Sequence, residues 1–361
     1  GALHAVVGEG EGAAAAAALV LSGGDDGVVR AWDPATLAPK FTVAALPGPA
    51  WAPPGKGLTG AISSVFCDAA NGAILVGTKL NEVYVVPGEA AGPPATRLVE
   101  AHAEGEVWGL AVHPLESQAE VATGGDDGTV RVWDLARRAL SRSRLIVPDP
   151  APVPRSSFNS GCVRSCAYSP DGSMLAVGLF CGDVHVLNSS DLSDVRVLRD
   201  HTEWVADLKW SPDGKLLATA AHDNTCRVYC PAEGWACKAT CRGHSSFLTS
   251  VNWSADGTKL VTTSGDYEIL HWEVPSGGRV RSSATCRDVE WASETGVLGW
   301  PVLGVWYKGS DGTDVNAVDV RGGKCVATGD DRGIVSLLKY PALGGDAKVY
   351  GGHSSHVTCV Q

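Results

Sequence analysis

Histidine and aspartate residues that could act as acid–base catalysts or bind a metal ion recur along this chain of 361 residues. Each occupies the same place in a repeated pattern, and fully hydrogen-bonded buried networks are structural by default. We therefore interpret them as part of the fold and not as a catalytic or metal site. They are His102, Asp127, His201, Asp223, His244 and Asp266. Outside this pattern, His356 alone would be a weak metal ligand, because His353 belongs to the repeat's usual Gly-His dipeptide.

Eleven cysteines offer a second kind of chemistry. Three pairs have C-x3-C spacing, whereas structural zinc sites prefer C-x2-C. Residues i and i+4 of a strand share a face, so each pair is interpreted as two small core-facing residues with reduced thiols. A cross-strand disulfide between Cys230 and Cys237 is the alternative. The pairs are Cys162/Cys166, Cys226/Cys230 and Cys237/Cys241.

Signatures of common enzymes are missing from the sequence. It contains no phosphate-binding Gly-Lys-Ser/Thr loop, no Gly-x-Ser-x-Gly elbow and no zinc signature. The sequence therefore predicts a protein that is not an enzyme and has no cofactor, metal or small-molecule substrate.

Composition and charge restrict the fold and the partners. Apolar residues make up 44% of the chain, charged residues only 19%, and there are 44 Gly, which favours short strands joined by many turns. The net charge of −11 disfavours general binding to nucleic acid or anionic membranes. No apolar run is long enough to span a bilayer. Because the sequence starts at Gly1 without Met, we expect a segment of a longer chain.

A repeat of about 50 residues organises the sequence. Gly124–Asp134 closely matches Gly23–Asp33, and both end in Trp-Asp. The same position is filled more loosely at five further places. These are the stretches ending at Val86, Leu187, Tyr229, Trp272 and Leu338. The period and the Trp-Asp ending are typical of propeller blades.

Each repeat contains short strands separated by tight turns. In one copy, Glu203–Trp210 is followed by Ser211-Pro-Asp-Gly214, where Pro presets φ and Gly supplies a positive φ. Lys215–Thr219 and Cys226–Tyr229 provide the next two strands, and a fourth, outer strand follows. Related turns occur at Ser169–Gly172 and Ser254–Gly257.

This pattern resembles the WD-repeat family, in which His, Ser or Thr, Asp and Trp form a hydrogen-bonded set within a blade. The resemblance implies an all-β fold, a WD-repeat β-propeller with seven four-stranded blades; eight blades with a truncated last one is the alternative. One set fits at all four places, one has Tyr for Trp, and a third has three members. They are His102, Thr123, Asp127 and Trp133; His201, Thr219, Asp223 and Tyr229; and His244, Asp266 and Trp272.

Longer blocks toward the C-terminus resemble the echinoderm microtubule-associated protein-like family. They are Ser264–Trp272, Cys286–Trp291, Gly299–Trp306, Gly309–Val318 and Tyr350–Thr358. The resemblance implies the C-terminal half of that family's tandem atypical propeller, here a single domain over residues 1–361. The family's coiled coil is not present as a sustained heptad, so oligomerisation is not implied.

Two segments compete for the first strand of the first blade, Leu3 to Val7 and His356 to Val360. We expect the C-terminal segment to take this place and close a ring of seven blades, because open sheet edges invite aggregation. If the N-terminal segment takes it, an eighth blade is truncated.

An insertion at 279–313, between the sixth and seventh blades, interrupts the repeat and is the first candidate binding surface. It carries Trp300, Trp306, Tyr307 and Lys308, and aromatic side chains are enriched at interface centres. The alternative is that it covers a blade within the molecule.

Four arginines just after a Trp-Asp ending form the second candidate surface. Arg137, Arg138, Arg142 and Arg144 would suit the acidic surface of tubulin, because arginine makes multidentate contacts with carboxylates. A solvated edge strand protected by its charge is the alternative.

Two functions remain open. In the first, the chain is a protein-interaction module of a microtubule-associated protein, in the cytoplasm or the ciliary axoneme, that binds tubulin or another cytoskeletal protein. In the second, it is a WD-repeat peptide-recognition scaffold in a different assembly, such as a ubiquitin-ligase adaptor or a trafficking complex. The family resemblance favours the first.

Overall fold

The fold comes from a computed structural model of the chain. It describes residues 4–8, 19–33, 35–36, 38–43, 46, 61–68, 73–87, 95–102, 105–147, 161–307, 309–311, 314–321, 323–344 and 347–361. Chain contacts divide it into two compact units, Gly1–Gly105 and Glu106–Gln361. The assignment of residues 1–361 to one domain stays a prediction.

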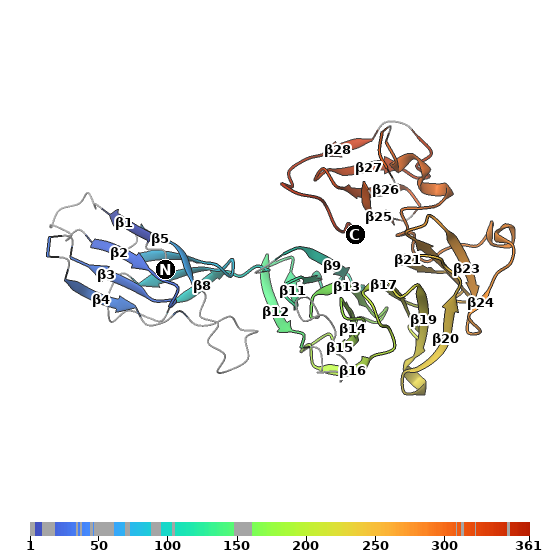
Figure 1. The fold of residues 1–361 in the computed structure, drawn as a ribbon, viewed down its shortest axis with the longest axis horizontal. Coiled ribbons are helices and arrows are strands. Elements are labelled where there is room, and N and C mark those ends of the chain that lie inside the picture. Colours follow the sequence, from blue (N-terminus) through green and yellow to red (C-terminus); the bar gives the residue numbers. More distant parts are fainter. Residues whose placement is uncertain are drawn as a thin grey trace. The chain divides into compact units, whose positions relative to one another are not determined.

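The described residues form seven four-stranded sheets in which consecutive strands pair antiparallel (Figure 1). This confirms the predicted all-β class. The first unit holds two sheets. Their strands are β1 (His4–Gly8), β2 (Leu19–Gly23), β3 (Val29–Trp32) and β4 (Pro39–Val43), then β5 (Ile62–Asp68), β6 (Ala73–Thr78), β7 (Val83–Pro87) and β8 (Thr96–Val99).

The second unit holds the other five sheets. Their strands are β9 (Val107–Val112), β10 (Glu120–Gly125), β11 (Thr129–Asp134) and β12 (Ala139–Leu145); β13 (Val163–Tyr168), β14 (Met174–Leu179), β15 (Val184–Asn188) and β16 (Asp194–Leu198); β17 (Val205–Trp210), β18 (Leu217–Ala221), β19 (Thr225–Cys230) and β20 (Ala236–Arg242); β21 (Leu248–Trp253), β22 (Lys259–Ser264), β23 (Ile269–Glu273) and β24 (Gly278–Arg279); and β25 (Val315–Arg321), β26 (Cys325–Asp330), β27 (Val335–Lys339) and β28 (Lys348–Tyr350). The first strands β9, β13, β17 and β21 contact one another in this order.

Among the described residues, three short 3-10 helices accompany the strands, η1 (Pro231–Glu233), η2 (Ser283–Cys286) and η3 (Trp300–Val305). None of the helices in the described ranges is long and apolar enough to cross a membrane.

The predicted turns hold the strands in register. In the sheet β17–β20, the Ser211 hydroxyl donates to Asp213 at 2.7 Å, and the Gly214 amide donates to the Ser211 carbonyl at 2.8 Å. Gly214 has φ +71°, which a residue with a Cβ rarely adopts. The turn therefore fixes which residues of β17 and β18 face each other.

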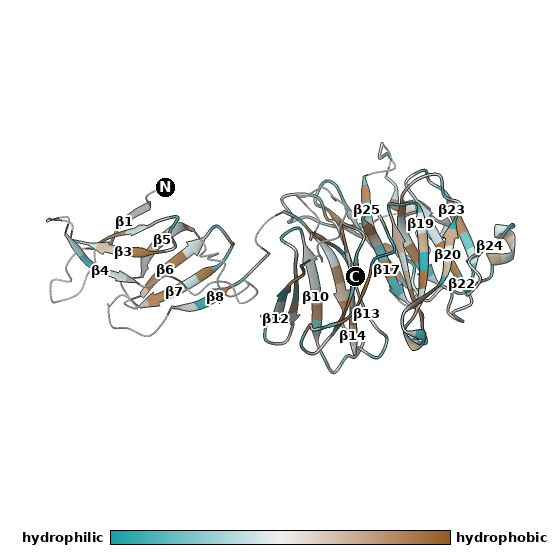
Figure 2. Ribbon diagram, turned by 60° about the horizontal axis from the view of Figure 1, so that its bottom comes forward, coloured by the Kyte–Doolittle hydropathy of each residue, from teal (hydrophilic) through white to brown (hydrophobic). Residues whose placement is uncertain are grey.

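Apolar side chains on the strands form the cores of both units, as the brown bands in Figure 2 indicate. Strand β6 alternates half-buried and buried residues, the pattern of a strand packed on one face. In the second unit, Trp253, Trp272 and Tyr229 are the largest fully buried aromatic side chains. Burial of such rings is a main source of stability in a sheet protein.

The first sheet is completed by the N-terminal segment. Strand β1 pairs with β2, with Val6 opposite Leu21. The residues His353–Gln361 form no strand. Our expectation that His356 to Val360 takes this place was wrong: the N-terminal segment already supplies the hydrogen-bonding edge that β2 needs.

Candidate protein-interaction surfaces

The histidine set of the sheet β17–β20 is a closed hydrogen-bonded chain. His201 precedes β17, and its two ring nitrogens lie 2.9 Å from Asp223 Oδ2 and 2.7 Å from Thr219 Oγ1. The Thr225 hydroxyl donates to the other Asp223 oxygen at 2.6 Å. Tyr229 is completely buried in the place of the expected Trp, and no hydrogen bond joins its hydroxyl to Thr219.

The same set controls the charge of Asp223. Burial alone would raise the pKa of this carboxyl, but the hydrogen bond and the charge of His201 and the Thr225 hydroxyl outweigh it and hold the pKa well below its ordinary value. Asp223 is therefore a charged, fully engaged group and not an available acid or base.

The sheet β21–β24 builds its set differently. His244 Nε2 lies 2.7 Å from the Thr262 hydroxyl, and the Trp272 indole donates to the same oxygen at 2.8 Å. Thr262 is a member that the sequence analysis missed, although it occupies on β22 the place of Thr219 on β18. Asp266 does not bind the histidine. It accepts hydrogen bonds from the Ser245 and Ser264 hydroxyls.

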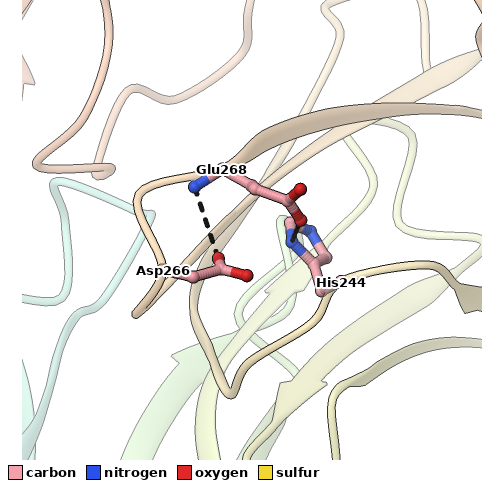
Figure 3. Close-up of side chains that lie close together, drawn as sticks. All are labelled: His244, Asp266 and Glu268. Carbon is pink, nitrogen blue, oxygen red and sulfur yellow. Dashed lines mark hydrogen bonds and ion pairs between the residues drawn. The ribbon is translucent and has the colours of Figure 1, made fainter.

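Figure 3 shows His244, Asp266 and Glu268 together. Glu268 takes the position facing the histidine, with its Oε2 3.7 Å from His244 Nδ1. Burial lowers the pKa of His244, while Glu268 acts against this shift. The three residues place possible metal ligands within 4.8 Å of one another. Because serine hydroxyls occupy the Asp266 carboxylate, two ligands remain, fewer than protein zinc sites use.

The sheet β9–β12 has its own polar set. The Trp133 indole donates to Thr123 at 2.7 Å, and Asp127 accepts from the Thr129 hydroxyl at 2.7 Å. Arg131, whose side chain is 1% exposed, pairs with Asp127 at 3.5 Å. The sequence analysis missed this arginine, which alternation places on the buried face. The participation of His102 in the set stays a prediction.

The arginine run divides into two halves. Arg142 donates to both Glu120 oxygens, at 2.9 and 2.7 Å, and to the Ser189 carbonyl at 2.8 Å. Arg144 pairs with Asp194 and donates to the Leu192 carbonyl. Both arginines of β12 thereby join their sheet to the next one, β13–β16. Arg142 and Arg144 lie on the outer strand β12, but both side chains are paired within the molecule and only part-exposed, and their contact with a partner stays a prediction.

Arg137 and Arg138, by contrast, lie exposed in the turn between β11 and β12. Arg138 adopts φ +52°, and the Arg137 amide donates to Asp134 at 2.9 Å, so the turn is held while both side chains face solvent. For these two residues, contact with an acidic partner stays a prediction.

Most aromatic side chains of the insertion cover the molecule itself. Trp291 lies near the His271 ring, and the Trp306 indole donates to the Val297 carbonyl at 3.1 Å. Tyr307 stacks under Arg332, whose guanidinium carbon is 3.9 Å from the ring centre. Lys308 lies outside the described residues. Trp300 differs, because its side chain is 64% exposed.

The cysteines with described side chains are free thiols, Cys230 and Cys237 among them. Burial raises the pKa of the Cys166 thiol. A buried, protonated thiol is unreactive, which agrees with a packing role.

Comparisons with known proteins identify the family to which the chain belongs. Residues 107–361 match the family model described as the second beta-propeller of echinoderm microtubule-associated protein. The chain belongs to the echinoderm microtubule-associated protein family. The matched residues coincide with the second structural unit, which begins at Glu106. The predicted family, its C-terminal propeller and the propeller fold are confirmed.

Individual relatives agree with this assignment. The 77 kDa echinoderm microtubule-associated protein of Lytechinus variegatus is 39% identical over 293 residues, 79% of this chain and 41% of the relative. The echinoderm microtubule-associated protein-like 2 of Homo sapiens is 41% identical over 269 residues, 73% of this chain and 39% of the relative. The echinoderm microtubule-associated protein-like 1 of Homo sapiens is 36% identical over 293 residues, 80% of this chain and 34% of the relative. The chain thus spans well under half the length of these relatives.

Proposed function

We propose that this chain is a non-enzymatic protein-interaction module that attaches to microtubules, either to tubulin or to a neighbouring cytoskeletal protein. The observation that carries the proposal is the family match over residues 107–361, because the relatives are named as microtubule-associated proteins. The cytoskeleton of the cytoplasm or of the ciliary axoneme would then be its location.

An exposed apolar surface on the second unit is suited to such contacts. Trp300 and Leu303 on η3 and Leu343 are 64%, 58% and 50% exposed, and we call these three residues the Trp300 surface. Trp is the residue most often found at the energetic centre of protein interfaces.

Backbone hydrogen bonds hold the Trp300 surface in place. The Ala342 amide donates to the Pro301 carbonyl at 2.7 Å, and the Gly304 amide donates back to the Ala342 carbonyl. A Cβ at Gly304 would lie 2.3 Å from the Gly344 nitrogen, so glycine is required for this close approach. Because the surface is already ordered, binding costs little conformational entropy.

Cosedimentation of the chain with stabilised microtubules tests the proposal. We expect the wild type to pellet with microtubules. The double variant Trp300→Ser, Leu303→Ser should bind about tenfold more weakly, the loss typical of a central interface anchor. Leu98→Ser, at a similarly exposed leucine (59%) on β8 of the first unit, is the control and should bind as wild type does.

A second arm separates the contributions of charge. Arg137→Glu with Arg138→Glu should reduce binding at low salt and have little effect at high salt, because exposed charges are screened over about 8–10 Å. Removal of tubulin's acidic tails should have the same effect on the wild type. No pelleting of the wild type under any salt condition contradicts the proposed function, whereas unchanged binding of the Trp300 variant contradicts only the assigned surface.

A further inference from the structure

A row of aromatic rings crosses one end of consecutive sheets in the second unit. Trp108 lies near the start of β9, Trp204 immediately precedes β17 and Phe247 immediately precedes β21. Trp108 meets Trp204 edge to face at 5.6 Å. His222, which follows β18, lies between Trp204 at 4.2 Å and Phe247 at 4.5 Å, stacked on both rings. Rings from the sheets of β9, β17 and β21 therefore form one continuous aromatic row.

The chain itself shows that these rings hold a cationic side chain. The Arg164 guanidinium carbon lies 4.7 Å from the Trp204 ring centre, 5.0 Å from that of Trp108 and 5.3 Å from that of Phe180. Asp126 neutralises this arginine at 3.0 Å. At this end of the row the cation–π sites are filled from within the molecule.

The other end of the row is open. Phe247 is 41% exposed and Tyr267, in the turn after β22, is 59% exposed. The Phe247 ring lies directly over Gly265, where a Cβ would come within 2.3 Å of the ring. Both aromatic residues line a cavity of about 480 Å³ together with Trp204 and His222. Binding sites for small ligands and for short peptide segments have volumes of this order.

Acidic residues adjoin the aromatic residues of this cavity in the sequence. Tyr267 stands between Asp266 and Glu268, both part-exposed, and the exposed Glu203 immediately precedes Trp204. Hydrogen bonds from hydroxyl and amide donors lower the pKa of Asp266 to about 2, and the Ser245 hydroxyl has the largest effect. The Asp266 carboxylate is therefore anionic throughout the physiological range. Burial lowers the pKa of His222 to about 4, so the ring between the two aromatic residues carries no competing positive charge at neutral pH.

We propose that the surface formed by Phe247, Tyr267, Asp266 and Glu203 binds an extended basic segment of a partner protein, with an arginine stacked on the open rings and paired with a carboxylate. Arg164 already makes this kind of contact on the neighbouring rings. Arg164 and Lys209 both line the cavity, and each is paired with an aspartate, Asp126 at 3.0 Å and Asp207 at 3.2 Å, so neither charge is left uncompensated against a second guanidinium. A basic partner is the chemical opposite of the acidic one expected for Arg137 and Arg138. The inference does not depend on microtubule attachment.

Fluorescence anisotropy with a short fluorescein-labelled peptide of alternating arginine and glycine tests this inference. The matched peptide replaces each arginine with citrulline, which has nearly the same shape without the charge. We expect the arginine peptide to bind and the citrulline peptide to bind at least about tenfold more weakly, since the neutral side chain loses both the cation–π contact and the ion pair.

Variants locate the binding surface. Tyr267→Asn keeps a residue that tolerates the positive φ of this position (+63°) and removes the ring. Tyr267→Asn and Glu203→Gln should each weaken the arginine peptide about threefold or more. Phe247→Leu should also weaken binding of the arginine peptide. If the Phe247→Leu variant does not fold, Tyr267→Asn and Glu203→Gln still test the proposal.

Controls use matched residues away from this surface, Tyr350→Ala on β28 and Glu116→Gln in the β9–β10 turn, both exposed. They should bind the arginine peptide as the wild type does. Equal binding of the citrulline peptide, unchanged binding by Tyr267→Asn and Glu203→Gln, or equal losses in the controls would each overturn the proposal.

Discussion

The sheets β17–β20 and β21–β24 begin from the same sequence pattern and use their acidic residue in opposite ways. In the first, Asp223 turns inward and lies 2.9 Å from His201 Nδ1. In the second, Asp266 turns outward to the Ser245 and Ser264 hydroxyls, and Glu268 faces the histidine from 3.7 Å. One carboxylate stabilises the blade, while the other remains at the surface.

The difference follows from the neighbouring residues. Ser245 follows His244 and offers a hydroxyl to Asp266, whereas Thr202 follows His201 and offers its backbone amide to Asp223 at 3.3 Å. Trp272 supplies the second hydrogen bond to Thr262, which the buried Tyr229 does not supply to Thr219. In both sheets the threonine holds the histidine ring by a hydrogen bond. The acidic residue is therefore not required for this and can make other contacts.

The first prediction tests this contrast directly with Asp223→Ala and Asp266→Ala. Loss of the Asp223 carboxylate leaves His201 and Thr225 with unpaired buried groups and should cost about 2–3 kcal/mol of unfolding free energy. Loss of the Asp266 carboxylate leaves the exposed Ser245 hydroxyl to water, and the buried Ser264 hydroxyl keeps the Glu268 carbonyl as an acceptor at 3.4 Å, so the cost should be clearly smaller. Urea unfolding of both variants at pH 7 measures the difference, and equal losses would contradict the division into inward and outward roles.

The second prediction concerns the arginine run, which also contains one residue bound within the molecule, Arg142, and one exposed residue, Arg137. Arg142→Glu places a negative charge beside Glu120 and breaks the bond to Ser189, so it should cost about 2 kcal/mol. Arg137→Glu changes an exposed side chain and should stay within about 0.5 kcal/mol. Thermal unfolding of the two variants at the same ionic strength compares them. If Arg142→Glu leaves the unfolding free energy unchanged, Arg142 is a solvated surface residue and its contacts with Glu120 and Ser189 do not stabilise the fold.

Much of the fold could be predicted from the sequence, because turns and periodic apolar residues act locally. The Ser-Pro-Asp-Gly turns, the seven repeats and the positions of His201, Thr219 and Asp223 all follow from such local signals. The first strand of the first sheet could not be chosen this way. Both candidate segments have the apolar alternation of a strand, and only the pairing of β1 with β2 decides between them.

The surfaces were harder to predict, because exposure depends on contacts between distant segments. Their spacing in the sequence grouped four arginines, but Glu120, Ser189 and Asp194 come from other strands and turns, and they engage two of the four within the molecule. The insertion likewise gave three aromatic candidates without indicating that Trp300 alone among them is mostly exposed. The aromatic row around His222 was missed because its members come from separate repeats.

The third prediction concerns His222, which lies where the two compared sheets meet. Burial first, and then the charge of Arg164, lower its pKa from 6.5 to about 4. Between these values the unfolded chain binds the proton and the folded chain resists it, so stability falls as the pH falls from about 6.5 to about 4. Because the ring is partly exposed and screened, we expect a contribution of about 1–2 kcal/mol.

His222→Phe retains the stacking on Trp204 and Phe247 and removes the titrating group. Urea unfolding of wild type and variant at pH 7 and pH 5 should therefore show a smaller loss of stability on acidification in the variant. His244 and His271, whose pKa values burial also lowers, titrate in both proteins and cancel in the comparison. An unchanged pH dependence would show that His222 gains its proton as easily in the folded chain as in the unfolded one.

The last and smallest effect is expected for Glu268→Gln, which changes the carboxylate that faces His244. The glutamate charge acts to raise the pKa of His244 against the effect of burial, so its removal should lower that pKa further. The distance of 3.7 Å is too long for a hydrogen bond, and Thr262 still holds the other ring nitrogen, so the unfolding free energy at pH 7 should change by about 0.5 kcal/mol or less. An NMR titration of the His244 ring measures the shift.

Asp223→Asn is the matched variant in the other sheet. It removes the charge from a carboxylate in direct contact with His201 at 2.9 Å, so it should reduce the unfolding free energy. If Glu268→Gln destabilises the chain as much as Asp223→Asn does, the glutamate is a structural partner of the histidine, and the two sheets differ only in which acidic residue fills that place.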